Sequence, residues 1–324
     1  MCTAVTYHGD GFYFGRTLDL EYCYREAVCV TARNYPFCFR GTDPMYHHYA
    51  MIGMAYVVDG YPLYYDGVNE KGVCIAGLNL PVSTRYFSFA SGWDNITSYE
   101  LIPWILGQCA NMEQVRELLG RIRLTDIPFR EDVPLTPLHW MISDSQDCLV
   151  VESLEDGLHV YDNPIGVLTN EPAFPMQMVH LSNYMGVSHL PPKNEVCPGV
   201  ELPVYSRGMG GIGLPGDWSS QSRFVRAAFT CNHVLPGKSQ EESMEQFFHI
   251  LSSVEQPEGC VQLEDGRWVK SVYTSCCNAE KGIYYYKTYE NSTITGVDMY
   301  REDLESDRII SYPLCREQLI RMEN

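Results

Sequence analysis

The second residue of the chain, Cys2, carries the first group that could act as a nucleophile. Removal of Met1 is expected when the next residue is this small, and it leaves a thiol and a free α-amine on Cys2. Their reference pKa values, about 8.5 and about 7.7–8.0, both lie near neutral pH. Such a residue can serve as nucleophile and base without a catalytic histidine. The alternative interpretation is a cysteine packed in the first strand, because free cysteines are often buried.

Arg16 and Asp19 are charged residues that follow a predicted hairpin with an Asp-Gly turn at residues 10–11. The second strand of this hairpin passes back beside Cys2 and brings them near it. A guanidinium about 4 Å from a thiolate stabilises it by up to about 4 kcal/mol at an effective dielectric of roughly 20. The carboxylate can hold the α-ammonium in place. A separation of three puts the two side chains on opposite faces of a strand, so we expect the chain to turn at Thr17-Leu18. A surface ion pair is the alternative.

The glycine-rich segment Gly208–Gly213 fits the pattern G-x-G-x-x-G of dinucleotide-binding proteins. That interpretation needs a helix directly after it, and Leu214-Pro215-Gly216-Asp217 breaks any helix there. We therefore interpret this segment as a glycine-rich loop. The 13 cysteines form no C-x-x-C pair, and no Cys/His spacing resembles a zinc site. We expect no cofactor and no metal.

Charge and composition exclude several classes of protein. Across 324 residues, 41 acidic against 23 basic residues give a net charge of −18. This balance argues against nucleic-acid binding and against a basic membrane-binding patch. The longest nearly apolar stretch, Tyr49–Val58, is too short to span a membrane, and the N-terminus has no secretory signal. We therefore expect a cytoplasmic protein that binds neither nucleic acid nor membrane.

Hairpin patterns and helical patterns come in blocks along the chain and do not alternate one by one. The predicted strands are Thr3–Tyr7, Phe12–Arg16, Cys148–Ser153, Leu158–Tyr161, Trp268–Thr274, Gly282–Tyr289 and Ser292–Met299. The predicted helices are Ser98–Gly107, Met112–Leu119 with Asn111 as N-cap, a segment from Ser219 or Ser220 through Phe229, and Ser239–Leu251. This order favours antiparallel sheets covered by helices, hence one α+β domain over residues 1–324.

Six blocks of sequence resemble the choloylglycine hydrolase family of N-terminal-nucleophile hydrolases, in the family's order. They are Met1-Cys2-Thr3, Phe14–Asp19, Asp66–Gly72, Ala76–Pro81, Leu168–Pro172, and Gly213–Asp217 with Ser222-Arg223-Phe224. The resemblance implies a four-layer αββα fold with two antiparallel sheets, a homotetramer, and hydrolysis of the amide between a bile acid and glycine or taurine.

The resemblance also implies a role for each matching position. Cys2 is the nucleophile, its own α-amine moves the proton, and Arg16 and Asp19 orient and tune it. By the same resemblance the Asn79 main-chain N–H and the Asn170 side chain form the oxyanion hole, which agrees with the need of a tetrahedral intermediate for two donors on its oxygen. Arg223 supports the site.

The implied substrates, glycine- and taurine-conjugated bile salts, join a flat apolar steroid to an anionic tail. An apolar pocket with few polar groups suits the steroid. Candidates for its wall, which are alternatively ordinary core residues, are Leu18, Leu20, Tyr65 and Leu138. Arg207 in the glycine-rich segment resembles the taurine-preferring type and suits a sulfonate; the alternative is a solvated loop charge.

Two other functions remain open at the level of sequence. A penicillin V acylase has the same fold and nucleophile, but such enzymes more often have Tyr where this chain has Asn79. A non-catalytic steroid-binding or thiol-redox protein, with Cys2 merely packed, belongs to another class. It predicts that Cys2→Ala changes nothing measurable.

Overall fold

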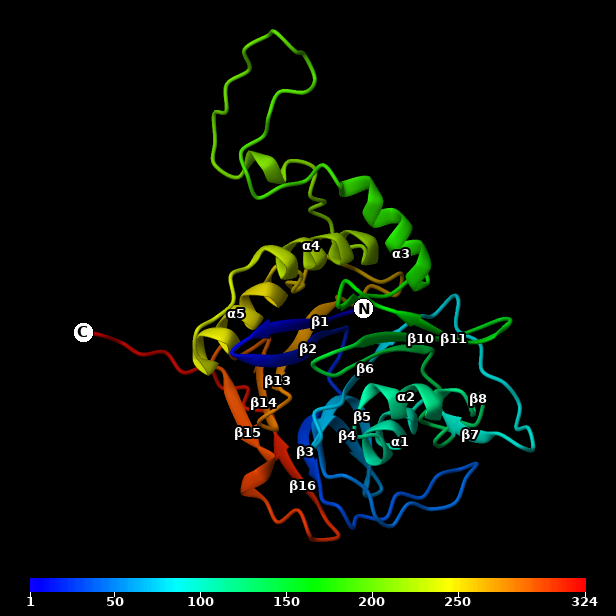
Figure 1. Ribbon diagram of the computed structural model, residues 1–324. Coiled ribbons are helices and arrows are strands. Elements are labelled where there is room, and N and C mark those ends of the chain that lie inside the picture. Colours follow the sequence, from blue (N-terminus) through cyan, green and yellow to red (C-terminus); the bar gives the residue numbers. More distant parts are fainter.

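The computed structural model describes residues 1–324 and contains two large antiparallel sheets between helical layers (Figure 1). The six-stranded sheet consists, in spatial order, of β12 (Val167–Leu168), β1 (Cys2–Gly9), β2 (Gly11–Leu20), β13 (Lys270–Asn278), β14 (Ile283–Thr288) and β15 (Thr295–Asp298). The eight-stranded sheet consists of β11 (Gly157–Asp162), β10 (Cys148–Leu154), β9 (Leu138–Ser143), β6 (Cys74–Asn79), β5 (Tyr61–Asn69), β4 (Met51–Val58), β3 (Ala27–Thr31) and β16 (Ile309–Pro313).

Helices cover the outer face of each sheet. Those on the six-stranded sheet are α3 (Phe174–Leu181), α4 (Ser220–His233) and α5 (Gln240–Ser252). Those on the eight-stranded sheet are α1 (Leu101–Gln108) and α2 (Met112–Leu119). The arrangement confirms the predicted α+β fold with four layers in the order αββα. One small parallel pair, β7 (Asp94–Thr97) with β8 (Ile122–Thr125), was not predicted.

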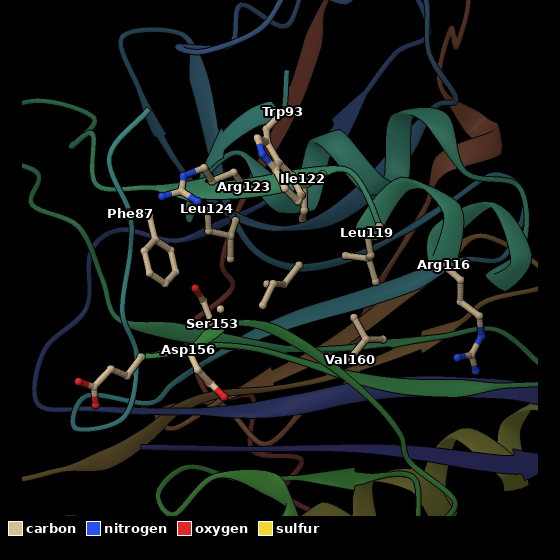
Figure 2. A pocket seen from close by; sticks show the side chains of 14 residues that line it. Phe87, Trp93, Arg116, Leu119, Ile122, Arg123, Leu124, Ser153, Asp156 and Val160 are labelled. Carbon is tan, nitrogen blue, oxygen red and sulfur yellow. The ribbon is translucent and has the colours of Figure 1, made fainter. Parts of the chain in front are cut away.

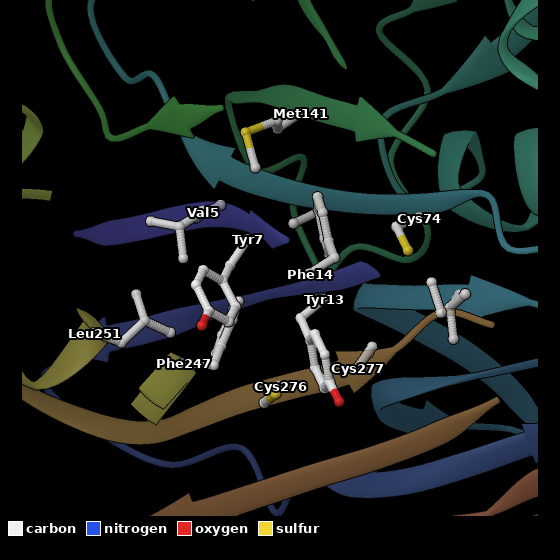
Figure 3. Close-up of a cluster of buried hydrophobic side chains, with 14 of the residues drawn as sticks. Val5, Tyr7, Tyr13, Phe14, Cys74, Met141, Phe247, Leu251, Cys276 and Cys277 are labelled. Carbon is white, nitrogen blue, oxygen red and sulfur yellow. The ribbon is translucent and has the colours of Figure 1, made fainter. Parts of the chain in front are cut away.

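Two clusters of buried apolar side chains hold these layers together. The larger one lies between the sheets and beneath α4 and α5, and Figure 3 shows part of it, with Phe14, Met141 and Phe247 among its members. The second lies between the eight-stranded sheet and α1 and α2. Strand β10 contributes Val150 to the first cluster and Val151 to the second, which explains why its first four residues, Cys148–Val151, are all apolar. Because one sheet faces both clusters, we infer that the chain folds as one domain.

The sequence signals at the first turn and at the starts of α2, α4 and α5 agree with the structure, whereas α1 begins at Leu101 and not at Ser98, and β2 continues to Leu20. Gly11 has φ +104° at the predicted Asp-Gly turn, a conformation that favours glycine. The Asn111 side chain accepts a hydrogen bond from the main-chain N–H of Gln114 and caps α2. The Ser219 side chain caps α4 in the same way by accepting from Ser222, and Ser239 caps α5.

One local prediction was wrong. The chain does not turn at Thr17-Leu18, because β2 continues to Leu20 and is paired with β1 on one side and β13 on the other. Arg16 and Asp19 therefore stay on opposite faces of one strand.

The segment between α3 and α4 contains only two short 3₁₀ turns, η1 (Ser182–Tyr184) and η2 (Met209–Gly211). It extends away from the layered body at the top of Figure 1. A third turn, η3 (Met299–Arg301), follows β15. The glycine-rich segment 208–213 is not followed directly by a helix, since α4 begins at Ser220.

Candidate active site

Strand pairing places Cys2 opposite Leu18 and Arg16 opposite Ala4, so the Cys2 and Arg16 side chains lie on the same face of the six-stranded sheet. Arg16 Nη2 donates a hydrogen bond to Cys2 Sγ. Both residues are buried; Cys2 is 2% exposed and Arg16 is 0% exposed. The sulfur of Cys2 therefore has a cationic donor against it in a buried site.

The Arg16 guanidinium is fixed by main-chain acceptors from both sheets. Nε donates to Thr17 O at 3.1 Å, and Nη1 donates to Tyr65 O at 3.3 Å and to Gly77 O. Burial lowers the pKa of Arg16, but its acidic neighbours, with Cys2 foremost, outweigh burial and raise that pKa overall. Arg16 therefore stays charged beside the sulfur.

The Cys2 main chain is held from the opposite face by α4 and by the residues that follow β12. Cys2 N donates to Asn170 Oδ1 at 2.8 Å. Arg223 Nη1 donates to Cys2 O at 2.5 Å, and Arg223 Nη2 donates to Asn170 Oδ1 at 2.7 Å. Burial is the main cause that lowers the pKa of Arg223. Sulfur and nitrogen of Cys2 are thus each fixed by a separate set of polar contacts.

Asp19 lies on the Arg223 side of β2, with its carboxylate 3.9 Å from Arg223 Nη1. The carboxylate accepts hydrogen bonds from Ser271 Oγ at 2.6 Å and from Gln256 Nε2 at 3.2 Å. Its main chain pairs with Met1: Asp19 N donates to Met1 O at 2.9 Å, and the Met1 amine donates to Asp19 O. The expected contact between the Asp19 carboxylate and the Cys2 nitrogen is not made, because Cys2 N donates to Asn170 Oδ1 instead.

Asn79 and Asn170 lie side by side near Cys2. Asn170 Nδ2 donates to Asn79 O at 2.8 Å, which leaves the second Nδ2 hydrogen without a protein acceptor. Leu80 N donates to Pro137 O, so by the alternation of an antiparallel ladder the Asn79 N–H points away from β9. Two N–H donors from two different segments are therefore available in one place.

Of the four predicted wall residues, three are partly exposed and one is not. Leu18 is 3% exposed and belongs to the core between the sheets. The other three, which are partly buried and pack at the edges of the two clusters, are Leu20, Tyr65 and Leu138.

The structure does not bring Arg207 into contact with these residues. Arg207 is exposed in the segment between α3 and α4 and lines a pocket of about 460 Å³ with Tyr205 and His189. Another pocket of about 580 Å³, which Figure 2 shows with Trp93 and Leu119 in its wall, lies beside α2 and β8. Neither pocket is lined by Cys2.

Several contacts of the site carry no signal in the sequence. Gln256 and Ser271, which hold Asp19, and Thr3, whose Oγ1 accepts from Arg223 Nη1 at 2.7 Å, belong to segments far apart along the chain. Ser220 Oγ accepts from Asn170 N at 2.9 Å. No spacing rule connects these positions; only the folded sheets do. No cluster of three or more His, Cys, Asp or Glu side chains could hold a metal ion, and no helix has the length and apolarity to span a membrane.

Comparison with known proteins agrees with this fold. The family model of linear amide C–N hydrolases, choloylglycine hydrolase family, matches residues 2–312. The chain belongs to that family and is an amide hydrolase.

One relative is the bile salt hydrolase/transferase of Lactiplantibacillus plantarum, which is 49% identical over 317 residues. The matched region covers 98% of this chain and 98% of the relative. The crystal structure of a mutant conjugated bile acid hydrolase from Clostridium perfringens is similar with a TM-score of 0.92, 36% identity and full coverage of both chains. Penicillin V acylase from Agrobacterium tumefaciens shares the fold, with a TM-score of 0.76 at 19% identity over 96% of this chain and 90% of that one.

Proposed function

We propose that this protein hydrolyses the amide bond of conjugated bile salts and releases free bile acid with glycine or taurine. The observation that carries the proposal is the Cys2 thiol held by the Arg16 guanidinium, with the Cys2 nitrogen hydrogen-bonded to Asn170. The substrate class follows from full-length relatives that are named for bile salts or conjugated bile acids.

The nucleophile in this proposal is the Cys2 thiolate, and its base is the α-amine of the same residue. We propose that Met1 is removed in the cell, so that Cys2 N becomes a free amine beside Sγ. Removal of Met1 also frees the main-chain N–H and C=O of Asp19, which Met1 occupies. Asn170 Oδ1 already accepts from Cys2 N and would keep the amine oriented.

In the first half of the reaction, Cys2 Sγ attacks the amide carbon and a tetrahedral intermediate forms. The Asn79 N–H and the free Nδ2 hydrogen of Asn170 would donate to its oxyanion; losing one such donor typically costs about 3–4 kcal/mol in the barrier. The C–N bond then breaks, and the α-ammonium gives its proton to the departing amine of glycine or taurine. A bile acyl thioester remains on Cys2.

In the second half, water replaces the amino acid. The neutral α-amine takes a proton from water, the resulting hydroxide attacks the thioester carbonyl, and the C–S bond breaks. Free bile acid leaves, and the Cys2 thiolate and α-ammonium are restored. Every proton is moved by groups of Cys2 itself, so the cycle balances without a further co-reactant.

We propose that Leu20, Tyr65 and Leu138, which are partly exposed, contact the steroid, and that Leu18 acts through the core beneath them. The preference for taurine conjugates that Arg207 suggests from the sequence stays a prediction. Arg207→Ala should weaken hydrolysis of taurine conjugates more than that of glycine conjugates. Equal effects on both conjugates would rule out this role.

Transfer of the acyl group to an amine is a second candidate activity, because the relative from Lactiplantibacillus plantarum is named both hydrolase and transferase. A thioester reacts with an amine as well as with water. Added free amino acid should then yield a new bile acyl amide alongside free bile acid; free bile acid alone would exclude transfer.

The test is a competition assay in reducing buffer with equimolar taurocholate, glycocholate and penicillin V, followed by mass spectrometry of the products. We expect free cholate from the wild type and none from Cys2→Ala. Cys277→Ala is the matched control: Cys277 is also buried, and burial raises the pKa of its thiol well above the usual value, so its loss should leave activity unchanged.

Phenoxyacetate as the only product would assign the chain to the penicillin V acylases. Equal activity of Cys2→Ala and wild type would contradict the nucleophile and favour a packed cysteine.

A further inference from the structure

We propose that His139 and Glu152, a buried pair outside the six residues of the site, are positioning residues for the oxyanion donor Asn170. This inference rests on the proposed function. His139 lies on β9 and Glu152 on β10, one position beyond the cross-strand pair of Trp140 and Val151. Both side chains are 0% exposed, and His139 Nδ1 lies 2.9 Å from Glu152 Oε1.

The second ring nitrogen of His139 connects the pair to the segment that carries Asn170. His139 Nε2 lies 3.0 Å from Thr169 O, and a carbonyl oxygen only accepts, so Nε2 must carry a proton. Thr169 follows β12 in the six-stranded sheet, whereas His139 belongs to the eight-stranded sheet. The hydrogen bond therefore links the two sheets one residue before Asn170.

Glu152 holds the same segment on the other side of Asn170. Its Oε1 accepts from the main-chain N–H of Phe174 at 2.9 Å, at the first residue of α3. The pair thus holds the chain at Thr169 and at Phe174, and Asn170 lies between these two points. This contact also satisfies one of the N–H groups that the start of a helix leaves unpaired.

Contacts from the helical layer complete the support of Asn170. Ser220 Oγ accepts from Asn170 N at 2.9 Å, and Gln177 Nε2 donates to Asn170 O at 3.2 Å. With the main chain held from both layers, the Asn170 side chain meets Cys2 N and Asn79 O. Stability alone does not require such a pair, because apolar residues of similar size often replace a buried ionisable pair without loss.

A shift of the Asn170 amide should slow the chemical step more than it weakens substrate binding. The oxyanion exists only in the tetrahedral intermediate and its transition states, so its donors act on kcat. A misplacement of about 1 Å can cost roughly 100-fold in rate. His139 and Glu152 themselves touch neither Cys2 nor the proposed oxyanion donors, so their influence passes through the main chain at Thr169 and Phe174.

The experiment compares His139→Gln and Glu152→Gln with wild type in kcat and KM for taurocholate and glycocholate. We expect kcat to fall about 10- to 100-fold with little change in KM. His48→Gln is the matched control, because buried His48 also places its ring nitrogens against main-chain oxygens, those of Tyr49 and Tyr35, away from Cys2. It should keep the wild-type kcat.

Alkylation of Cys2 by iodoacetamide separates positioning of Asn170 from general damage to the site. This reaction displaces iodide and forms no oxyanion, so its rate should stay at the wild-type value in both Gln variants. A parallel fall in kcat and alkylation rate would overturn the inference, and so would an unchanged kcat.

Two measurements need no bile salt substrate. A crystal structure of His139→Gln should show Asn170 moved away from Asn79 O; an unmoved Asn170 would contradict the inference. If neither variant folds, ¹⁵N NMR of His139 in the wild type still tests the inference. It should show a proton on Nε2, and an unprotonated Nε2 would overturn the inference. Absence of bile salt hydrolysis in wild type would instead refute the proposed function and leave these two measurements valid.

Discussion

Asn170 uses the two ends of one amide for opposite tasks. Oδ1 accepts from Cys2 N and Arg223 Nη2, and Nδ2 donates to Asn79 O. An amide is neutral, so its Nδ2 donates without placing a second negative charge near the Cys2 sulfur. A carboxylate of the same shape would have no donor at all.

Asn170→Ala should therefore lower kcat by about 10²- to 10³-fold with a small effect on KM, because it removes one oxyanion donor. Asn170→Asp, which has the same size, should lose at least as much, since a carboxylate repels both Asn79 O and the oxyanion. Steady-state kinetics on taurocholate check this. Near wild-type activity of Asn170→Asp would mean that Asn170 only orients Cys2.

The motif blocks named residues that the structure brings together around Cys2, but they did not predict how these residues meet. The spacing of Arg16 and Asp19 correctly predicted that their side chains lie on opposite faces of a strand. The turn that we inferred to bring both of them to Cys2 is absent. The turn is unnecessary because Arg223, from a helix far along the chain, approaches Asp19 on the second face. Contacts of this kind depend on tertiary packing, which no spacing rule encodes.

At the scale of elements, the start of α4 matters for the site and the start of α2 does not. Ser219 caps α4, which carries Arg223 in its first turn, and Asn111 caps α2. The hydroxyls of Ser219 and then Ser222 lower the pKa of Asp217 to about 2, so this carboxylate stays charged beside the start of α4. The negative charge of Asp217 stabilises the start of α4, because the N-terminal end of a helix carries a partial positive charge.

Ser219→Ala and Asn111→Ala should each lower the free energy of unfolding by about 1 kcal/mol, measured by urea denaturation, because each removes an N-cap. Only Ser219→Ala should also lower kcat, since it loosens the turn that holds Arg223 against Cys2 O. An equal loss of activity in both variants would show that activity follows stability rather than the position of Arg223.

The elements with strong local signals were predicted, and those that depend on neighbours were not. Caps and turns gave the limits of α2 and α5 within about one residue. Helix α3 lacks a side-chain cap and has Pro175 at its start, and because its exposed face carries Met176 and Val179, no helical spacing of apolar residues marked it. Strand β16 pairs with β3 across almost the whole length of the sequence, and only the fold reveals that pairing.

At the scale of the molecule, a buried carboxylate joins the two sheets. Asp66 on β5 accepts from Tyr273 Oη at 2.7 Å and from Tyr284 Oη at 2.6 Å, both from the six-stranded sheet. Burial is the main cause that raises the pKa of Asp66, and Arg16 partly opposes it. The sheet that carries Cys2 is thus anchored to the sheet whose carbonyls hold Arg16.

Tyr284→Phe should lower the free energy of unfolding by about 1–3 kcal/mol, because it leaves one oxygen of buried Asp66 without its donor. Tyr285→Phe is the matched control on the same strand. Its hydroxyl accepts from Gln240 Nε2 nearer the surface. Tyr285→Phe should therefore lower the free energy of unfolding by less than Tyr284→Phe does. Guanidinium denaturation compares the two variants; equal costs would contradict a special role for the inter-sheet contact.

The homotetramer implied by family resemblance stays a prediction. The segment between α3 and α4 exposes large apolar side chains that another copy of the chain could cover, namely Met185, Leu190, Val196, Leu202 and Tyr205. Light scattering should then give about four times the chain mass of 36.9 kDa.

The central claim is that one residue at the N-terminus, Cys2 with a free α-amine, carries out the chemistry. The most direct measurement is timed alkylation by iodoacetamide, with residual bile salt hydrolysis and peptide mass spectrometry followed on the same samples. Activity should fall in proportion to alkylation of Cys2 in chains that lack Met1, and not with alkylation of exposed cysteines such as Cys197 or Cys260. Full activity in chains that retain Met1, or after complete alkylation of Cys2, would contradict the claim.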